Sequence, residues 1–317
     1  MGDQKFCLIV GAGMAGLTAA EELLRSGWQV TILDKGRRPG GRMATRTVGE
    51  TRFDHGAQFF TVRDHRFEQR VNAWLSAGWV KPWFEAEGHT RYCGVDGMNR
   101  IALELAKPFD VRLETTVQRT EASGNRWRIH TQAGETFEAD ALVMTPPIPQ
   151  TLALLETCLL SSETRSVLEG LSYQPCFAVL ATLTGPSAIP SPGCIQLPDG
   201  PVTFLADNTQ KGISTGPTAV TIHASPEFTR EFFHATHDDV AKRLIDAVLP
   251  WLGSTPREWQ VHRWKFSLAI QTAPEPCLFS KSPAPVAFAG DALCGARIEG
   301  AFLSGLAAAG RLLQNFA

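Results

Sequence analysis

Three glycines near the start of the chain have the spacing of a dinucleotide-binding turn. Gly11, Gly13 and Gly16 follow the apolar run KFCLIV and precede apolar side chains at helical spacing. The first glycine permits a tight turn, the second lets backbone approach a pyrophosphate, and the third lets the helix pack close to the strand. The amides that begin the helix offer the phosphates a partial positive charge. The spacing therefore predicts a dinucleotide site, and the alternative is a glycine-rich helix start.

Asp34 closes the second predicted strand, WQVTILD, 23 positions after Gly11. A carboxylate at this place can accept hydrogen bonds from the ribose hydroxyls of an adenosine. Because NAD and FAD share the adenosine half, Asp34 fits either dinucleotide.

The stretch DKGRRPGGRMATR, residues 34–46, suits a nucleic-acid patch, a linker or a phosphate-binding turn. Lys plus Arg is 30 and Asp plus Glu is 32, so the formal charge of −2 argues against a general nucleic-acid surface. The stretch follows the second strand, which would place it at the carboxyl edge of a sheet, beside a pyrophosphate. Arg42 follows two glycines and can bring its planar guanidinium to phosphate. We expect Arg37 and Arg46 to be solvated or paired surface charges.

Four segments resemble the flavin amine oxidase superfamily. Residues 38–42 match its R-x-G-G-R motif, and residues 54–59 (DHGAQF) resemble the D-x-G-A-Q-aromatic segment of its renalase-like branch. Residues 290–291 (Gly-Asp) and 297–301 (RIEGA) resemble its C-terminal flavin-contacting strand end and helix start. The resemblance implies non-covalent FAD. The residues expected to bind it are Gly11, Ala12, Gly13, Met14, Ala15, Gly16, Asp34, Lys35, Arg42, Met43, Ala57, Gln58, Phe59, Val117, Gly290, Asp291 and Ile298.

The expected fold class is α/β. A Rossmann-like FAD-binding domain, of the amine oxidase and p-hydroxybenzoate hydroxylase type, would be interleaved with an α+β substrate domain. The FAD-binding domain would comprise residues 1–62, 96–150 and 276–317, and the substrate domain residues 63–95 and 151–275. Within the latter, the pattern of residues 225–253 predicts helix.

The renalase-like branch implies a substrate, an isomeric dihydronicotinamide dinucleotide with its hydride at ring position 2 or 6. Hydride would pass to flavin N5, and O₂ would reoxidise the flavin to give H₂O₂ and NAD(P)⁺. Such a donor gains aromaticity on oxidation, so no acid or base is required and we name no catalytic side chain. His55 is a candidate base, although a histidine in a turn is more often structural. The residues expected near the substrate are Gln58, Phe60, His262 and Trp264.

Two other functions remain open. A flavin amine oxidase or desaturase would favour an aromatic cage and a lysine near N5, for which Lys265 is a candidate. An escort-type protein would keep the fold without redox chemistry, but the phosphate motifs here favour a working flavin.

Seven cysteines are scattered without a CxxC pair, which favours reduced thiols and predicts no metal site. We further expect no nucleic-acid or membrane partner and a cytoplasmic location.

Overall fold

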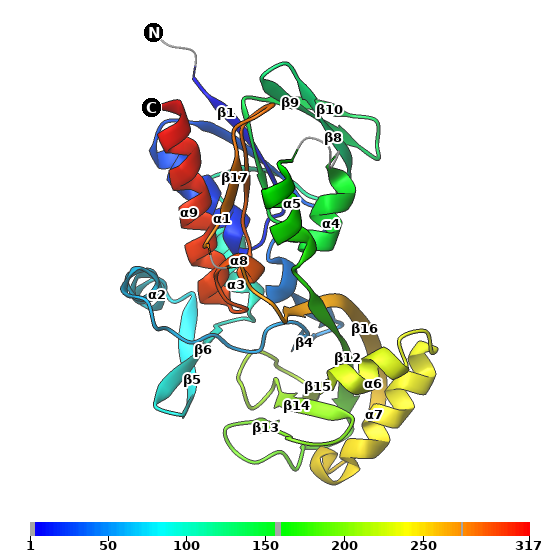
Figure 1. Cartoon of the computed structure of the whole chain (residues 1–317). Coiled ribbons are helices and arrows are strands. Elements are labelled where there is room, and N and C mark those ends of the chain that lie inside the picture. The colour runs from blue at the N-terminus through cyan, green and yellow to red at the C-terminus, as the bar shows by residue number, and fades with distance from the viewer. Residues whose placement is uncertain (1–3, 156–159, 274) are drawn as a thin grey trace.

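The computed structural model describes residues 4–155, 160–273 and 275–317. Its largest sheet has six strands in the order β17-β18-β11-β1-β2-β7 (Figure 1). All neighbours in it are parallel except β17, which runs antiparallel to β18. The strands are β1 Phe6–Val10, β2 Gln29–Leu33, β7 Asp110–Arg112, β11 Ala141–Met144, β17 Leu278–Ser280 and β18 Val286–Phe288. Parallel strands that lie far apart in sequence form this sheet, as expected for a doubly wound fold.

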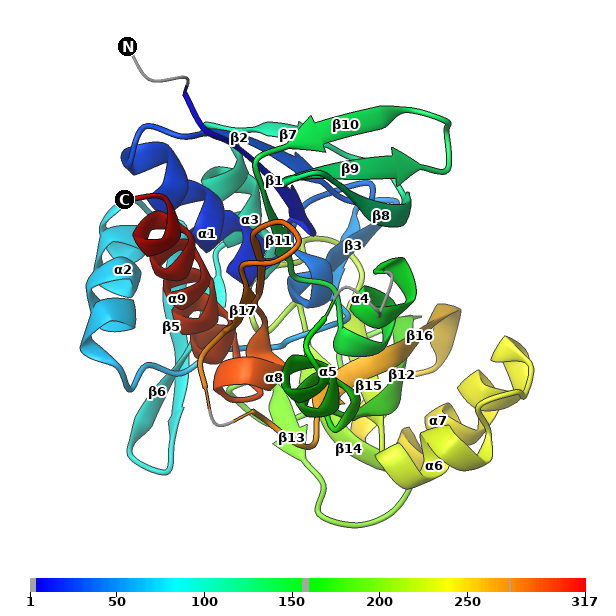
Figure 2. The same ribbon diagram turned by 45° about the horizontal axis from the view of Figure 1, so that its top comes forward.

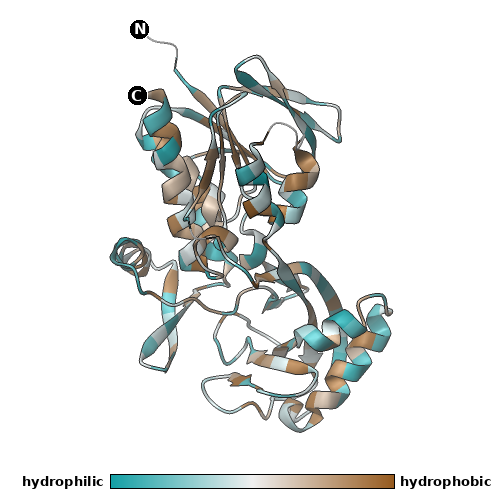
Figure 3. Cartoon of the chain, viewed as in Figure 1, coloured by the Kyte–Doolittle hydropathy of each residue, from teal (hydrophilic) through white to brown (hydrophobic). Residues whose placement is uncertain are grey.

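The two faces of this sheet are covered by different elements (Figure 2). Cys7 and Ile9 of β1 pack with α1 and α9, whereas Leu8 and Val10 point to the other face. That second face is covered by α4, α5 and a three-stranded sheet of order β10-β9-β8. The elements are α1 Met14–Arg25, α3 Asn99–Ala106, α4 Ile148–Leu154, α5 Ser162–Glu169, α9 Ile298–Phe316, β8 Val117–Ser123, β9 Arg126–Thr131 and β10 Thr136–Ala139. Because both faces are covered, the central strands β1, β11 and β18 consist of apolar residues, and the middle of the sheet is mostly brown in Figure 3.

Helices α1 and α9 pack closely because Gly305 has no side chain. A Cβ atom at this position would lie 2.4 Å from the carbonyl oxygen of Ala15 in α1. We therefore expect Gly305→Val to lower the free energy of unfolding by about 1–3 kcal/mol, as overpacked cores do. Urea unfolding of the variant would measure this loss. Gly310→Val in the same helix is the control, since a Cβ there meets nothing within 4 Å; equal stability losses in the two variants would contradict the prediction.

A second sheet has five antiparallel strands in the order β13-β14-β15-β12-β16. They are β12 Tyr173–Leu183, β13 Cys194–Gln196, β14 Val202–Asp207, β15 Ala219–Ala224 and β16 Pro256–Ala269. Helices α6 Pro226–Glu231 and α7 His237–Leu252 pack on one face of it. We call the six-stranded sheet with its covering elements the first lobe, and the five-stranded sheet with α6 and α7 the second lobe. The other face of the five-stranded sheet is turned toward the first lobe (Figure 1).

The helix expected over residues 225–253 is two helices. Ser225 caps α6 by accepting a hydrogen bond from the amide of Phe228, and Thr236 caps α7 by accepting one from Asp239. A second N-cap inside the pattern therefore starts a new helix.

Smaller elements join the two lobes. Residues 41–43 form a 3₁₀ turn, η1 Gly41–Met43, which leads into the hairpin of β3 Thr45–Val48 and β4 Thr51–Asp54. Next come α2 His65–Ser76 and the hairpin of β5 Val80–Ala86 and β6 His89–Gly94. The short helix α8 Asp291–Cys294 precedes α9. We retain the division into the two domains predicted above as a proposal.

Among the described residues, no helix is both long and apolar enough to span a bilayer. The six cysteines in the described ranges are unpaired, and Cys158 lies outside them.

Candidate active site

A large cavity opens where the parallel strands of the first sheet end. Strands β1, β2, β11 and β18 end at Val10, Leu33, Met144 and Phe288, and parallel strands share one carboxyl edge. The cavity extends from this edge to the open face of β16 and has a volume of about 1760 Å³. Pockets for a single drug-sized ligand measure roughly 300–1,000 Å³. The cavity can therefore hold a dinucleotide and a second molecule.

The glycine turn lies at the edge of this cavity in the expected geometry. Gly11 has a φ of +105°, and a Cβ there would lie 2.3 Å from the hydroxyl oxygen of Thr145. A Cβ at Gly16 would lie 2.0 Å from the carbonyl oxygen of Gly11, so this residue lets α1 approach the turn. A Cβ at Gly13, by contrast, meets nothing within 4 Å, and Gly13 lines the cavity. The open space beside Gly13 is where a phosphate can approach the backbone.

Asp34 is tied to the same turn. Its Oδ2 accepts a hydrogen bond of 2.6 Å from the amide of Ala12, and its Oδ1 accepts one of 2.6 Å from the amide of Gly36. A carboxylate has about four acceptor sites, so two remain for other donors. Asp34 therefore fixes the turn and keeps capacity for ribose hydroxyls.

Arg42 and Asp291 connect the two ends of the chain. Arg42 Nη1 and Nη2 donate to the two carboxylate oxygens of Asp291, at 2.8 and 2.5 Å, and Nη1 also donates to the carbonyl of Ser267. Burial lowers the pKa of Arg42, but the charge and hydrogen bonds of Asp291 outweigh that effect, and the net pKa is raised. Both side chains line the cavity, so this ion pair offers donors at its wall while its net charge is balanced.

The segment of residues 54–59 packs directly on the arginine turn. The amide of Ala57 donates to the carbonyl of Arg42 at 2.9 Å, and a Cβ at Gly56 would lie 2.0 Å from that oxygen. Gln58 is expected from the sequence to contact FAD and to lie near the substrate, but its Nε2 donates to the carbonyl of Asp54 at 2.6 Å. The Gln58 amide thus closes its own turn, although the residue still lines the cavity.

The N-terminus of α9 also faces the cavity. Ile298 begins the helix, and Arg297 at the N-cap makes no side-chain cap hydrogen bond. Glu299 does not face the cavity but is buried, and its Oε1 accepts hydrogen bonds from the amides of Arg63 and Asp64. A helix start that is not capped by a side chain presents amide donors and a partial positive charge to a ligand.

Most of the remaining predicted residues line the same cavity, and three do not. Those that line it are Met14, Ala15, Lys35, Met43, Phe59, Val117, Gly290, His262 and Trp264. Ala12 and Gly16 belong to the glycine turn but do not line the cavity. Phe60 is buried in an aromatic core, with its ring 5.7 Å from that of Phe67 and 5.6 Å from that of Tyr92. Because strand and extended residues alternate in direction, Phe59 faces the cavity and Phe60 faces away from it.

Histidines and a tryptophan form the wall of the cavity on the five-stranded sheet. The carbonyl of His55 accepts a hydrogen bond of 2.7 Å from Trp264 Nε1 and lies 3.3 Å from His223 Nε2. The rings of His262 and Trp264 lie 4.3 Å apart. Burial is the main cause that lowers the pKa of His55 to about 3, and those of His223 and His262 to about 4. This wall is therefore made of neutral rings at physiological pH.

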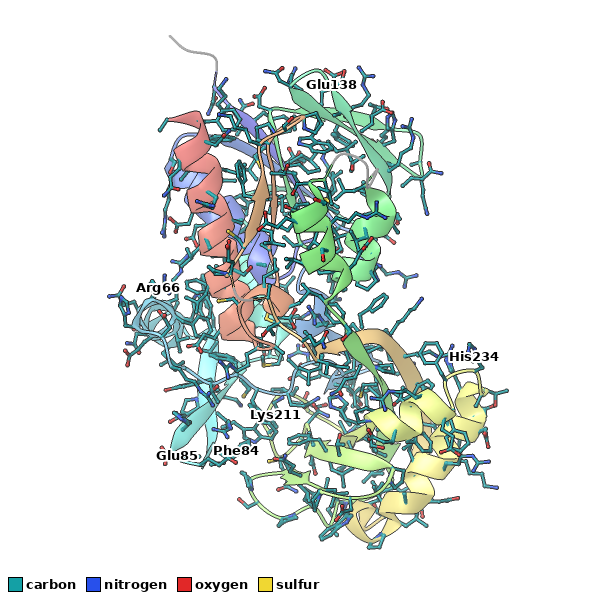
Figure 4. The ribbon with its side chains drawn as sticks, viewed as in Figure 1. Arg66, Phe84, Glu85, Glu138, Lys211 and His234 are labelled. Carbon is teal, nitrogen blue, oxygen red and sulfur yellow. The ribbon has the colours of Figure 1, made fainter. Side chains whose placement is uncertain are left out.

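Sequence reasoning missed a buried ion pair behind this wall. Lys211 Nζ donates to Asp54 Oδ2 at 2.7 Å and to the carbonyl of Gln58 at 2.6 Å, and both charged side chains are fully buried. Figure 4 shows Lys211 at the junction between the β5–β6 hairpin and the five-stranded sheet. Lys211 precedes a glycine in a polar loop, where no pattern distinguishes it from a solvated lysine. The signal available was Asp54, an acid that directly follows Phe53 at the end of β4.

The donor set fits a flavin nucleotide. Two helix N-termini, the open glycine at position 13 and the Arg42 guanidinium all line one cavity. Together they provide backbone amides and a cation where an extended, phosphate-bearing ligand would lie.

Comparison with protein families gives two matches that together cover most of the chain. The family described as NAD(P)-binding Rossmann-like domain matches residues 9–75, and Flavin containing amine oxidoreductase matches residues 74–313. Renalase of Mus musculus is 27% identical over 289 residues, which are 82% of this chain and 84% of that protein. A neurosporene-forming phytoene desaturase of Rhodobacter capsulatus is 46% identical over 57 residues, 18% of this chain and 11% of its own.

Solved structures share the whole fold. A putative protoporphyrinogen oxidase from Exiguobacterium superposes with a TM-score of 0.75 at 14% identity and covers 100% of this chain and 99% of its own. A putrescine oxidase double mutant superposes with a TM-score of 0.67 at 13% identity over 98% and 99% of the two chains. The chain therefore belongs to the flavin containing amine oxidoreductase family, as a renalase-like flavin-dependent oxidoreductase.

Proposed function

We propose that the chain is an oxidase of isomeric dihydronicotinamides, 2- or 6-dihydroNAD(P), with FAD bound non-covalently. Bound FAD would accept the hydride at N5 and pass the electrons to O₂, so that dihydroNAD(P), O₂ and a proton give NAD(P)⁺ and H₂O₂. The residues expected above to bind FAD and lining the cavity are proposed as its contacts.

The main support for this proposal is the charge of the side chains that line the cavity. The acidic side chains among its described lining residues are Asp34 and Asp291, and both are already bonded, to backbone amides and to Arg42. The other charged side chains of the lining are basic. Such a wall favours an anionic dinucleotide over a cationic amine. Lys265, the candidate for an amine oxidase mechanism, also lines the cavity, but it is exposed and its Nζ lies over the ring of Phe266.

Anaerobic mixing with candidate substrates tests the proposal. The purified protein should be yellow, and 2- or 6-dihydroNAD(P) should bleach the oxidised flavin band quickly, whereas amines should not. Admission of O₂ should restore the band with release of H₂O₂. Rapid bleaching by amines and none by the dihydronicotinamides would make the protein an amine oxidase instead, and a colourless protein would favour the escort function.

The rate of flavin bleaching by the dihydronicotinamide is expected not to depend on pH between about 5 and 9. The pKa values of His55, His223 and His262 are lowered to about 3, 4 and 4, so these rings are neutral throughout that interval. Hydride transfer from a dihydronicotinamide also needs no proton removal. Stopped-flow measurement at saturating substrate gives the profile. A sigmoid centred near neutral pH would indicate a general base and contradict this interpretation.

A further inference from the structure

Arg46 does not lie among the surface charges, where the sequence led us to expect it. It lies on β3, is half-buried and lines the cavity beside the open face of β16. Its Nη1 donates to Gln260 Oε1 at 3.2 Å, and its Nη2 lies 3.3 Å from His262 Nδ1. Gln260 and His262 are two positions apart on β16, so they share one face of the strand and fix the guanidinium between them.

The charge of Arg46 is not balanced by these partners. Gln260 is neutral, and burial followed by the charge of Arg46 lowers the pKa of His262 to about 4, so His262 is neutral too. Within the described residues, these two neutral groups are the hydrogen-bond partners of the Arg46 guanidinium. Arg42, four positions earlier, is by contrast bonded at both Nη atoms to Asp291. Burial also lowers the pKa of Arg46, as expected for a cation that loses water without gaining an anion.

The two arginines reach the cavity at separate places along β16. Arg42 contacts the carbonyl of Ser267, whereas Arg46 contacts Gln260 and His262. His262 pairs with Ala178 of β12, and Leu268, next to Ser267, pairs with Gln174. At about 3.3 Å for each of the four residues between them on β12, the two places lie roughly 13 Å apart. Trp264 and His55 occupy the wall between them. An anion bound by Arg46 is therefore distinct from the phosphates of a cofactor bound near Arg42.

We propose that Arg46 is a specificity-determining residue that binds a phosphate of the substrate. This inference rests on the proposed function and adds to it that the substrate carries phosphate at the end of the cavity remote from the Arg42–Asp291 pair. Guanidinium is suited to this task because its planar donors match phosphate oxygens, and two of its donors are already oriented by β16. A substrate ammonium group would meet an unbalanced positive charge at the same place.

The test compares Arg46→Gln with the wild type on substrates that differ only in phosphate. Anaerobic stopped-flow reduction at a series of substrate concentrations gives the Kd and the limiting rate. The substrates would be dihydronicotinamide dinucleotides with and without a 2′-phosphate, the mononucleotide and the phosphate-free riboside. We expect the Kd of the phosphate-bearing species to rise roughly tenfold to a hundredfold, the range for hydrogen bonds to charged groups. The Kd of the riboside and the limiting rate of flavin bleaching should stay unchanged. If affinity is lost only for the 2′-phosphorylated species, Arg46 binds that phosphate. If affinity is lost for all phosphorylated species, Arg46 binds the phosphate at the 5′ position.

Two control variants distinguish the effect of the Arg46 charge from a general effect on the fold. Arg46→Lys should recover part of the affinity for the phosphorylated species. Arg119 is an exposed arginine on β8, and Arg119→Gln should leave that affinity unchanged. Equal weakening of riboside and phosphorylated species, or no weakening of either, would overturn the proposal. If no dihydronicotinamide reduces the wild-type flavin, the proposed function fails on its own. Calorimetric binding of inorganic pyrophosphate, which needs no turnover, then decides the role of Arg46 by whether Arg46→Gln abolishes it.

Discussion

Replacing Lys211 with methionine is expected to lower the free energy of unfolding by about 3–5 kcal/mol, the cost of leaving one buried charge without its partner. The variant keeps most of the side-chain volume but leaves the Asp54 carboxylate without its cation. It also removes the hydrogen bond from Lys211 to the carbonyl of Gln58. Urea unfolding followed by tryptophan fluorescence measures the loss.

Two further variants make this prediction specific. Lys81→Met removes a partly exposed lysine that donates a hydrogen bond to the carbonyl of Gly212, next to Lys211, and should cost less than about 1 kcal/mol. Lys211→Met combined with Asp54→Asn should recover part of the stability, because the uncompensated charge is gone. If Lys211→Met and Lys81→Met lose equal stability, the buried pair does not stabilise the junction of the two lobes.

Gly13→Val is expected to leave the protein folded and to abolish flavin retention. A Cβ at Gly13 meets no protein atom within 4 Å, so the side chain would project into the cavity where we place the pyrophosphate. We expect the Kd for FAD to rise at least about a hundredfold, which is about 2.8 kcal/mol. Reconstitution of apoprotein with FAD, followed by flavin fluorescence, measures it.

The stability of the apoprotein distinguishes this effect from misfolding. Unfolding of apo Gly13→Val should differ from the wild type by no more than about 0.5 kcal/mol. Gly310→Val, another glycine with open space around its Cβ, should bind FAD as the wild type does. Normal FAD affinity in Gly13→Val would show that no phosphate approaches this turn and would remove the basis for the FAD contacts proposed here.

Local pattern was sufficient to predict that the glycine turn, Asp34 and Arg42 would lie together, and the structure brings them to one cavity. The glycine turn, Asp34 and Arg42 lie within one short stretch, and their geometry depends on one strand–turn–helix unit. Asp291 is remote in sequence, and it was predicted only because residues 290–291 resemble the Gly-Asp pair of the superfamily. The structure brings it to Arg42 because strands β1 and β18 end at a common edge of the sheet, so their following residues converge.

Side chains on the other lobe could not be placed in this way. Lys211 reaches Asp54 across 157 positions, and Arg46 reaches His262 across 216. Such pairs depend on how the five-stranded sheet docks on the β3–β4 hairpin, which no periodicity encodes. Phe60 shows the limit at short range, since the sequence does not reveal which of two adjacent aromatic residues faces the core.

The close packing of α1 against α9 also bears on how the chain is made. The ribosome releases α1 long before α9, and at about 5–20 residues per second the interval lasts tens of seconds. Throughout it, the part of α1 that packs against α9 in the finished fold has no permanent neighbour. We therefore expect nascent chains to require chaperone protection at that face, and cofactor loading to begin only after translation of α9.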